Sequence, residues 1–512
     1  MFAKSKSVDF AQFGLMKPIW VNDLIVRWSQ EKPDSVFLFD DHGQKITFQQ
    51  LEELTRKALV QLRFSSCFQP LLVALALPHG IELVIKILTL LRGEISGLVI
   101  DSQTPALKIK DWTTWLPITH LCFDPKQNAR FAGIGTPFQG ESDSAFYGLE
   151  MAVQQGSLSL HPHASWIQLT SGSTGCPKAV QISSASLFER SGSEAEYFEL
   201  SSSNVSLSSL HYSHDVGFNQ ILSHLQIGAS LLVVPFIFPE NILNAIRANG
   251  CNGIWGTPYF WRKLLQLNGG SQPLSKKVGL ATVSGGSLGL NEQAQLRAAL
   301  PNSRIVRTYG QSETFRTFFC YQHSESFSQI VPKVSIDWIP SSCGDKTEPL
   351  QLKHHGAGQM IGYLGDQPAL EDEGITTGDY FTIQTDGSYA FNGRRDDMIK
   401  RLDQRFFAVE VENLLRELPE VEDSYVFFKP NNLPEGDLIA CLYVAQGKQE
   451  ANLEDLKTRA HQLCRQKLSL QKTPNRFFVF EQRPSLPNGK LNKSEALRQA
   501  KAELERTLGR LV

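Results

Sequence analysis

Apolar and polar residues alternate along the first hundred positions in blocks of strand and helix length. Short apolar runs at 36–39, 71–77 and 97–100 predict strands, and the second run is apolar on both faces, which is typical of a buried parallel strand. Segments with helical spacing lie between them, at 47–62 and 81–91. This strand–helix–strand rhythm predicts an α/β layered fold with parallel strands.

The first of these helices carries its own start signal. Thr47 and Gln50 have the spacing of a capping box, in which each side chain binds the backbone N–H of the other residue. We therefore expect the helix to begin directly after Thr47.

The middle of the chain repeats the rhythm with short strands. Most of these strands are followed by glycine or proline. Strands that end in glycine-rich loops place those loops at the carboxyl edge of a sheet, where α/β proteins usually bind ligands. We expect strands at Trp166–Leu169, Ser230–Val234, Gly253–Trp255, Ala281–Ser284 and Ile305–Tyr309.

The pattern changes near residue 394. Beyond it, strands and helices come in smaller units, which predict a small α+β domain of ordinary size. Residues 1–393 are therefore predicted to form a large body, and residues 394–512 a C-terminal domain. The expected elements of this domain are helices at Val409–Leu418 and Leu453–Leu468 and strands at Tyr425–Phe428, Leu438–Val444 and Arg476–Phe480.

Composition narrows the class of protein but names no activity. The 512 residues are 41% hydrophobic, and 50 basic residues balance 52 acidic ones to a net charge of -2, which argues against a protein that binds a polyanion. No apolar run approaches the length of about 18 residues that a membrane span needs. The first residues lack the apolar core of a secretion signal, and the eight cysteines form no CxxC pair. We therefore expect a soluble, cytoplasmic, multidomain protein.

The strongest local signal is the loop that follows the strand expected at Trp166–Leu169. Its glycines let backbone N–H groups approach an anion, its hydroxyl groups add donors, and its lysine supplies a positive charge. The spacing is not that of a Walker P-loop, and Pro177 does not suit the start of the helix that follows a P-loop. The glycine, hydroxyl and lysine residues of this loop are Thr170, Ser171, Gly172, Ser173, Thr174, Gly175 and Lys178.

This loop resembles the phosphate loop of the adenylate-forming superfamily, which includes acyl-CoA synthetases, adenylation domains of nonribosomal peptide synthetases and firefly luciferase. Further motifs follow in the order of that family, and the resemblance covers roughly residues 20–500. It implies the fold of this superfamily, with a large body of layered sheets and helices and a small, mobile α+β domain at the C-terminus. The motifs are Tyr309-Gly-Gln-Ser-Glu313-Thr314, Gly358-Gln-Met-Ile-Gly362-Tyr363, Thr377-Gly-Asp379, Gly393-Arg-Arg-Asp396 and Pro487-Asn-Gly-Lys490.

The resemblance implies ATP-dependent activation of a carboxylate, with Mg²⁺ as the cofactor. The acid attacks the α-phosphorus of ATP and pyrophosphate leaves, so positioning and stabilisation of charge provide most of the catalysis. Glu313 would hold Mg²⁺, Thr314 would contact the α-phosphate, and Lys490 would bridge the carboxylate and the α-phosphate. The resemblance places ribose and adenine against Asp379, Arg394, Gly285, Gly286, Ser287, Gly310 and Tyr309, with the Tyr309 ring stacked on the base.

Two of these motifs also have plain structural explanations when each is taken alone. Asp379 suits a turn after Gly378, and Lys490 suits a solvated turn after Asn488 and Gly489. In the company of the other motifs, we interpret both as residues of the nucleotide site.

Members of this family rotate the small domain after adenylation, which withdraws the catalytic lysine and presents another face for thioester formation. Asp396 stands at the position of the family's hinge residue, and such a movement needs only a few residues to absorb the backbone change. Asp403 stands where the family usually has a glycine beside the pantetheine tunnel, and aspartate adopts positive φ less readily than glycine. We interpret Cys176, in the phosphate loop, as a packing residue, because the chemistry of the family needs no thiol nucleophile.

The acid pocket is expected around His214 and Asp215. Amino-acid-activating members of the family place an aspartate at the position of Asp215, where it pairs with the substrate ammonium and selects for an amine. Some fatty acyl-AMP ligases also have His-Asp here, but they insert an extra segment, for which the stretch from Phe315 to Thr376 leaves little room. This favours an amino acid. The expected pocket residues are His214, Asp215, Val216, Asn219, Trp255, Val283, Gly285, Thr308, Arg316 and Thr317.

Four side chains of this region leave choices open. Trp255 would shorten the pocket, which favours a small substrate. Arg316 either binds a second carboxylate of the substrate or pairs with Asp215. His211 and His214 fit the HxxH spacing of a metal site, although no further ligands accompany them.

The acceptor of the acyl group is expected to be a phosphopantetheine thiol. No carrier domain, which would take about 80 residues, follows Lys490, so we expect a separate carrier protein or CoA to supply the thiol. The leading hypothesis is an enzyme that loads a small amino acid onto a carrier protein, as in nonribosomal peptide and secondary-metabolite biosynthesis. The alternative is an acyl-CoA synthetase or fatty acyl-AMP ligase for an amine-free acid. No nucleic acid or membrane partner is expected.

Overall fold

The structure is a computed structural model. It describes residues 20–64, 72–138, 147–151, 158–170, 177–236, 239–248, 250–269, 273–286, 288–321, 326–340, 349–366, 373–401, 404–430, 436–444, 453–486 and 490–509. No helix among these residues is both long and apolar enough to cross a membrane.

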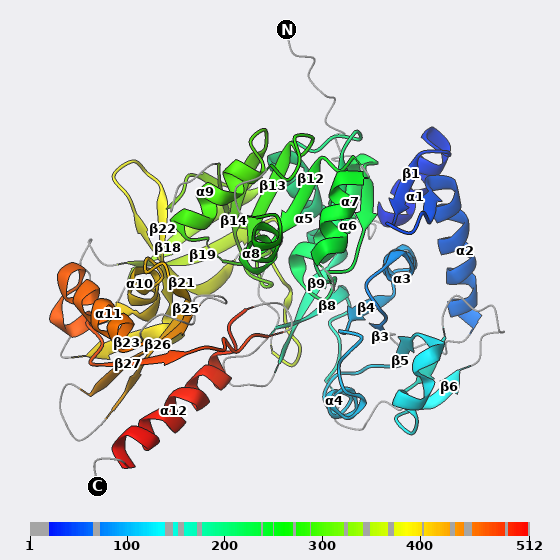
Figure 1. Ribbon diagram of the computed structural model, residues 1–512. Helices are drawn as coiled ribbons and strands as arrows, with labels where there is room; N and C mark the ends of the chain where they lie inside the picture. The colour runs from blue at the N-terminus through cyan, green and yellow to red at the C-terminus, as the bar shows by residue number, and fades with distance from the viewer. Residues whose placement is uncertain are drawn as a thin grey trace.

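Two large sheets form the body of the molecule (Figure 1). The first runs in the order β17 (Gln329–Ile330), β15 (Phe318–Tyr321), β14 (Arg304–Tyr309), β13 (Leu280–Ser284), β12 (Gly253–Gly256), β10 (Val205–Ser208), β11 (Ser230–Val233), β1 (Val36–Phe39) and β2 (Lys45–Thr47). The second runs in the order β20 (Gly362–Tyr363), β9 (Lys178–Ser183), β8 (Ala164–Thr170), β4 (Ser96–Val99), β3 (Leu72–Ala76), β5 (His120–Phe123), β7 (Gly148–Glu150) and β6 (Thr136–Phe138).

The central strands of both sheets are parallel, as the sequence predicts. In the first sheet, β14, β13, β12, β10, β11 and β1 pair in parallel in that order. In the second, β8, β4, β3 and β5 do the same, and antiparallel strands close the edges. The strands expected from the apolar runs are therefore present, with ends that differ by only a few residues.

The expected capping box forms. The backbone N–H of Gln50 donates to the Thr47 hydroxyl over 3.2 Å, and the backbone N–H of Thr47 donates to the Gln50 side chain over 2.9 Å. Helix α2 (Phe48–Phe64) begins directly after this pair. Because each side chain satisfies a donor that the helix itself leaves unpaired, the cap fixes the start of the helix.

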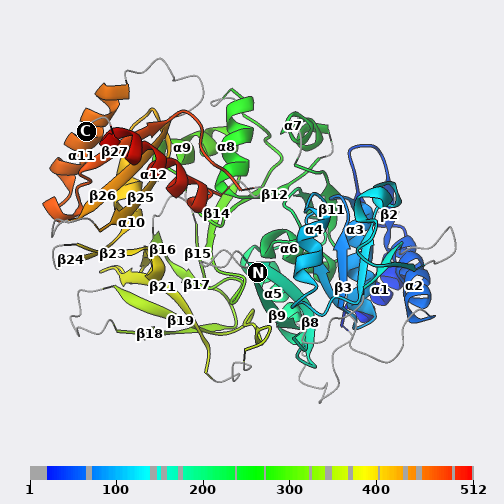
Figure 2. The same ribbon diagram turned by 90° about the horizontal axis from the view of Figure 1, so that it is seen from below.

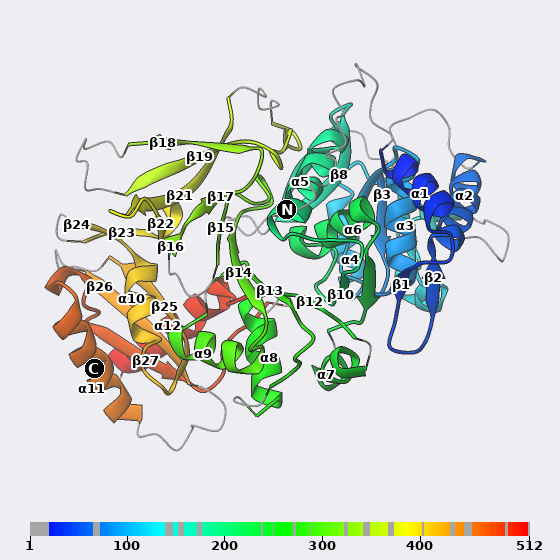
Figure 3. The ribbon, with the colours of Figure 1, turned by 90° about the horizontal axis from the view of Figure 1, so that it is seen from above.

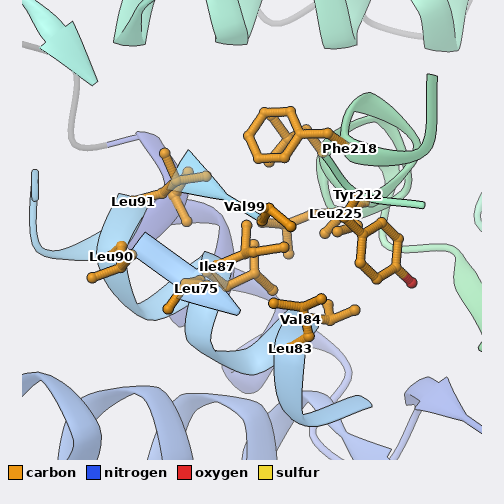
Figure 4. Close-up of a cluster of buried hydrophobic side chains, with 14 of the residues drawn as sticks. Leu75, Leu83, Val84, Ile87, Leu90, Leu91, Val99, Tyr212, Phe218 and Leu225 are labelled. Atoms are coloured by element: carbon orange, nitrogen blue, oxygen red, sulfur yellow. The ribbon is translucent and has the colours of Figure 1, made fainter. Parts of the chain in front are cut away.

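Helices join the two sheets through a shared apolar core. Leu75, Val84, Ile87, Val99 and Phe218 meet in this core (Figure 4). Its helical members lie on α1 (Trp20–Glu31), α2, α3 (Ile81–Arg92), α5 (Ser184–Tyr197) and α6 (Asp215–Ile227). A second core packs α7 (Pro239–Ala248), α8 (Pro258–Leu267) and α9 (Leu290–Ala299) on the first sheet, and a third packs α4 (Ala106–Trp112) and η1 (Pro125–Phe131) on the second.

A five-stranded antiparallel sheet follows the body strands, and the sequence pattern did not predict it. Its short strands mix exposed and buried positions, so no continuous apolar run marks them. Its order is β16 (Ser326–Phe327), β22 (Tyr389–Arg394), β21 (Ile375–Ile383), β19 (Leu350–Gly356) and β18 (Val334–Ile339).

The C-terminal elements lie at the opposite end of the molecule from α1, α2 and α3 (Figures 2 and 3). They form two apolar clusters without any member from before residue 398. The elements are η2 (Arg395–Asp397), β23 (Met398–Arg401), β24 (Gln404–Phe407), α10 (Ala408–Leu415), β25 (Val421–Lys429), β26 (Asp437–Val444), α11 (Leu453–Lys467), η3 (Leu470–Lys472), β27 (Arg476–Phe480) and α12 (Lys493–Gly509).

Candidate active site

The expected phosphate loop connects two antiparallel strands. Thr170, the last residue of β8, pairs with Lys178, the first residue of β9. A strand–loop–strand connection differs from the strand–loop–helix connection of a Walker P-loop, as Pro177 indicated. The expected phosphate ligands Ser171, Gly172, Ser173, Thr174 and Gly175 lie outside the described residues, as do Cys176, Ser287 and Asp403.

Tyr363 links the end of that loop to the expected magnesium ligand. The Lys178 ammonium lies 4.6 Å from the centre of the Tyr363 ring, and the Tyr363 hydroxyl donates to Oε1 of Glu313 over 2.8 Å. Burial and the neighbouring Glu313 carboxylate both raise the pKa of Tyr363, so this phenol stays a donor. Tyr363 therefore contacts both Lys178 and the motif residue Glu313, and it is a contact that sequence reasoning did not assign.

Asp379 lies within β21 and is 3% exposed, so the interpretation as a turn residue is wrong. The antiparallel register of β21 and β22 places it opposite Arg394, whose Nε donates to Oδ1 over 3.0 Å. Oδ2 accepts from the Tyr309 hydroxyl and from Nε2 of Gln311, both over 2.7 Å. Both carboxylate oxygens are therefore paired, and Gln311 joins the residues that the sequence indicated.

The aromatic ring of Tyr309 packs among phenylalanines beside this carboxylate. Its ring centre lies 4.9 Å from that of Phe381, in an edge-to-face arrangement. Burial and the Asp379 carboxylate raise the pKa of Tyr309 well above its ordinary value, so its hydroxyl remains protonated. The hydrogen bond to Asp379 thus fixes the orientation of the ring.

A tight turn between β14 and β15 carries Glu313, Thr314 and Arg316. A Cβ at Gly310 would lie 1.6 Å from the carbonyl oxygen of Phe315, so only glycine fits there. Phe315 has φ 59°, a left-handed conformation that bulky residues rarely adopt and that often accompanies function. The turn buries Thr314 completely, and its hydroxyl has no hydrogen-bond partner among the described residues.

The expected acid pocket contains a buried group of charged side chains. Nη1 of Arg316 donates to Oδ2 of Asp215 over 2.9 Å, and Asp215 is the first residue of α6. Burial by itself would raise the pKa of Asp215, but the charge of Arg316 and the more distant charge of Lys490 hold it below its ordinary value. The structure therefore realises the pairing of Arg316 with Asp215, one of the two roles expected for Arg316.

Helix α5 adds two residues that the sequence did not reveal. Nε of Arg190 donates to the Asn219 side-chain oxygen over 3.0 Å, and the Asn219 side-chain nitrogen donates to Oε2 of Glu194 over 2.8 Å. Burial raises the pKa of Glu194 to about 7 and lowers that of Arg190 to about 10. We call Arg190, Glu194, Asp215, Asn219 and Arg316 the buried polar cluster.

The other expected pocket residues divide between two faces of the first sheet. Trp255 is buried in an apolar group with Val216, and Thr308 bonds to Ser284 over 2.7 Å on the neighbouring strands. Val283, by contrast, packs with the side chains of α8 and α9 in the second core, so the structure does not bring it to Trp255. Thr317 is buried and bonds to His354 over 2.9 Å.

His214 is the N-cap residue of α6, directly before Asp215. Its ring centre lies 6.4 Å from that of His211, which bonds to the Ser213 hydroxyl over 2.7 Å. Among the described residues, no group of three potential metal-ligating side chains is present. The HxxH spacing is therefore not accompanied by a third described ligand.

Lys490 comes to this region from the C-terminal elements. A short hairpin carries it, because the backbone N–H of Leu486 donates to the Lys490 carbonyl over 2.8 Å and Ser485 bridges to Leu491. In Figure 1 this red segment, just before α12, extends toward the middle of the molecule. A Cβ at Gly285 would lie 3.9 Å from Cε of Lys490, and the ammonium acts electrostatically on His214 and Asp215.

The chain between the body and the C-terminal elements is short and polar. Arg394 ends β22, and the single turn η2 that follows contains Asp396. Lys493 at the start of α12 binds Asp397 over 2.7 Å. The expected hinge residue Asp396 is exposed and lies in the short 3₁₀ helix η2, between β22 and β23, so it takes no part in a sheet.

Comparison with known proteins agrees with this arrangement. Residues 124–344 match the family model described as AMP-binding enzyme. The chain is 24% identical over 505 residues to a dimodular nonribosomal peptide synthase of Bacillus subtilis, covering 90% of this chain and 21% of that protein. It is 25% identical over 346 residues to 3-hydroxybenzoate–CoA/4-hydroxybenzoate–CoA ligase of Thauera aromatica, covering 64% of this chain and 65% of that protein.

The fold is also that of known structures. The O-succinylbenzoate coenzyme A synthetase of Bacillus subtilis, in complex with ATP and magnesium ion, superposes with a TM-score of 0.76 at 18% identity, over 91% of this chain and 98% of that one. Residues 124–344 of the chain thus match an AMP-binding enzyme domain, and the chain has the fold of this synthetase. It spans less than two thirds of the length of both relatives named above.

Proposed function

We propose that this enzyme activates a small amino acid with ATP and transfers the acyl group to the phosphopantetheine thiol of a separate carrier protein. One observation carries the proposal. Lys490 arrives from the C-terminal elements at Gly285 and Asp215, between the expected nucleotide site and the expected acid pocket. A lysine at this junction is placed to touch both reactants.

The adenylation step needs few groups, because the nucleotide supplies the leaving group. A carboxylate oxygen of the acid attacks the α-phosphorus, the bond to the bridging oxygen breaks, and pyrophosphate leaves with that electron pair. Lys490 neutralises charge on the carboxylate as it approaches and on the α-phosphate as it becomes crowded. Removal of one such donor typically costs about 3 kcal/mol of transition-state stabilisation.

The nucleotide-side residues have chemistry that suits their proposed partners. Asp379 keeps unused lone pairs beside its three hydrogen bonds, so it can also accept the ribose hydroxyls. The Thr314 hydroxyl has no described partner, which suits a contact with the α-phosphate. Glu313 would hold Mg²⁺, a hard cation that prefers carboxylate and phosphate oxygens and would neutralise the phosphates. The similar synthetase that contains ATP and magnesium ion supports this assignment.

The amino-acid part of the proposal rests on Asp215. Its carboxylate is ionised and lies at the edge of the buried polar cluster, with 17% of its side chain exposed, so an ammonium can reach it. The pairing with Arg316 favours a second candidate, an acyl-CoA or acyl-AMP ligase for an amine-free acid. In that case Arg316 would neutralise Asp215 permanently.

The second step would use the C-terminal unit as a lid. We propose that residues 394–512 rotate about Asp396 once the acyl-adenylate has formed. The thiol then attacks the acyl carbon and AMP leaves with the carboxylate oxygen. The peptide synthase match, which covers 90% of this chain, supports a carrier-bound thiol, and the coenzyme A synthetase structure, which covers 91% of it, supports CoA as the alternative acceptor.

ATP–pyrophosphate exchange over a panel of amino acids and amine-free acids tests the proposal. We expect exchange with a small amino acid, and we expect Asp215→Ala to abolish it. Exchange with amine-free acids alone would contradict an amino-acid substrate and support the second candidate, a ligase for an amine-free acid. Exchange with no acid, in a protein that binds ATP, would contradict carboxylate activation altogether.

A further inference from the structure

We propose that the buried polar cluster recognises a second carboxylate of the substrate, so that the acid is a small amino acid with an acidic side chain. This inference rests on the proposed function and narrows its substrate class. Arg190 and Arg316 are the recognition residues, and Arg190 lies on α5, outside every motif that the sequence analysis used.

The first argument is that these arginines have donors without acceptors. Arg190 is 1% exposed and Arg316 is 3% exposed. Nη1 and Nη2 of Arg190, and Nε and Nη2 of Arg316, have no hydrogen-bond acceptor among the described residues. The Tyr197 hydroxyl lies beside Arg316 without a hydrogen bond of good geometry. Buried polar groups are normally paired, so this concentration of unpaired donors calls for a ligand.

Two other buried arginines, Arg92 and Arg401, have hydrogen-bond acceptors, as buried donors normally do. Arg92 is 8% exposed, and its guanidinium donates to Asn22, Glu52 and Thr55. Arg401 is 7% exposed and donates to two backbone carbonyls. Arg190 therefore differs from these two buried arginines in leaving two nitrogen atoms without an acceptor among the described residues.

The second argument is charge. Asp215 balances Arg316 at 2.9 Å, whereas Arg190 forms no ion pair within 4.0 Å among the described residues. Glu194, four residues further along α5, has a pKa of about 7 because of burial, so it offsets the Arg190 charge only in part near neutral pH. One guanidinium charge of the buried polar cluster is therefore only partly balanced by the described residues, and an anion is its natural complement.

The third argument is shape. Asn219 holds Nε of Arg190, and the guanidinium lies over the rings of Phe315 and Phe218, with its central carbon 5.0 Å and 5.6 Å from the ring centres. These contacts fix the plane of the guanidinium and leave Nη1 and Nη2 as a pair of parallel donors. A carboxylate accepts such a pair through both of its oxygens.

The test compares matched acids on the wild-type protein. Pyrophosphate exchange would be measured with aspartate against asparagine and glutamate against glutamine, which differ in charge but hardly in size. We expect kcat/KM for the better acidic amino acid to exceed that of its amide by about a hundredfold or more, because a site built for a polar group rejects the analogue that lacks it. Succinate and glutarate, which lack the amine, form the third arm.

The outcomes separate this inference from the proposed function. Equal or better exchange with the amides, or with neutral amino acids, would overturn the inference alone. Exchange with succinate or glutarate as good as with the amino acid would support the second carboxylate and contradict the need for an amine. Exchange with none of the acids would overturn the proposed function and this inference with it.

Two arginine variants test the recognition residue itself. Arg190→Met should lower the ratio of kcat/KM for acid over amide by at least about tenfold, because it removes the charge and the paired donors. Arg92→Met is the matched control, since it also removes a buried arginine but lies away from the acid pocket, and its ratio should stay at the wild-type value. An unchanged ratio in Arg190→Met would overturn the assignment. If Arg190→Met does not fold, the wild-type comparison of acid and amide still decides.

Discussion

Asp379 and Arg190 are both buried charges, but their surroundings differ. Asp379 has a partner at each oxygen: Arg394 on one, and Tyr309 with Gln311 on the other. Arg190 has one hydrogen bond, to Asn219, and two unpaired nitrogen atoms. The Asp379 carboxylate is thus fully paired before any ligand arrives, whereas two nitrogen atoms of Arg190 have no acceptor among the described residues.

The difference follows from what each side must bind. A carboxylate has more lone pairs than three donors use, so the protein can fix Asp379 in place and still leave it able to accept ribose hydroxyls. A guanidinium donor makes one strong contact, so any protein acceptor on Arg190 would have to leave before the substrate could bind. The unpaired donors of Arg190 therefore suit the proposed recognition of a second carboxylate of the substrate.

Lys490→Ala should have the largest effect and should divide the two half-reactions. We expect acyl-adenylate formation to fall by about a hundredfold to a thousandfold, because a charge at the reacting phosphate is lost. Transfer from chemically prepared acyl-adenylate to the thiol should change by less than about threefold, since the lysine would be withdrawn in that step. Pyrophosphate exchange and single-turnover thioester formation measure the two rates.

A control lysine in the same domain accompanies that variant. Lys467 binds Glu417 on the surface of the C-terminal unit, and Lys467→Ala should leave both rates at wild-type values. Equal losses of both half-reactions in Lys490→Ala would contradict a role confined to adenylation.

Asp379→Asn should weaken the binding of ATP and leave the selectivity for the acid substrate unchanged. The variant keeps the shape but removes the charge that balances Arg394, so we expect KM for ATP to rise by about tenfold or more. The ratio of kcat/KM for acidic amino acid over its amide should stay within about twofold of wild type. Steady-state kinetics with each reactant varied measures both quantities, and a change of acid selectivity would show that the two sides are not independent.

Gly310→Ala should destabilise the turn between β14 and β15, which carries residues of both the expected nucleotide site and the expected acid pocket. A Cβ would lie 1.6 Å from the Phe315 carbonyl oxygen, which the backbone cannot absorb without moving Phe315 and Arg316. We expect a loss of about 2–4 kcal/mol in the free energy of unfolding, as for other severe steric changes. Gly80→Ala is the control, because a Cβ there meets nothing within 4 Å, and urea unfolding of the two variants makes the comparison. Equal stabilities would contradict the close approach in this turn.

Glu194→Gln should have the smallest effect, and that effect should depend on pH. The folded protein keeps the Glu194 proton up to a pKa of about 7, whereas the unfolded chain releases it near the ordinary value of 4.5. Stability is therefore lost as pH rises through this interval, and the full penalty is present above about pH 7. The midpoint of thermal unfolding of the variant should exceed that of wild type by about 2 °C or more at pH 8, and by less at pH 5.

Glu189→Gln, on the same helix, is the control for that measurement. Glu189 is exposed, so its replacement should leave the difference from wild type constant between the two pH values. A difference that does not grow with pH for Glu194→Gln would contradict the raised pKa of Glu194.

Local signals of the sequence predicted much of the fold. The capping box at Thr47 and the apolar runs of the parallel strands depend on neighbouring residues, so they appear in the structure where the sequence places them. The antiparallel strands β18, β19, β21 and β22 were not predicted. Their residues mix exposed and buried positions, and the strands are stabilised by pairing with one another.

The residues of the candidate site likewise divide into those that the sequence predicted and those that it did not. Motif residues such as Asp379 and Lys490 could be named from the sequence because each has a fixed neighbourhood in the chain. Arg190 and Glu194 could not, since their spacing of four residues on α5 is equally suited to an exposed helix face. Only the packing of α5 against α6 and the turn at Phe315 shows that they are buried.

The most direct test of the central claim follows an oxygen atom. The enzyme would be supplied with ATP, a thiol acceptor and an acidic amino acid labelled with ¹⁸O in its carboxylates, and the products would be analysed by mass spectrometry. Attack of the carboxylate on the α-phosphorus, followed by transfer of the acyl group, predicts one ¹⁸O atom in AMP and none in pyrophosphate. Label in inorganic phosphate, with ADP as the other product, would show attack on the γ-phosphorus and would contradict adenylate formation.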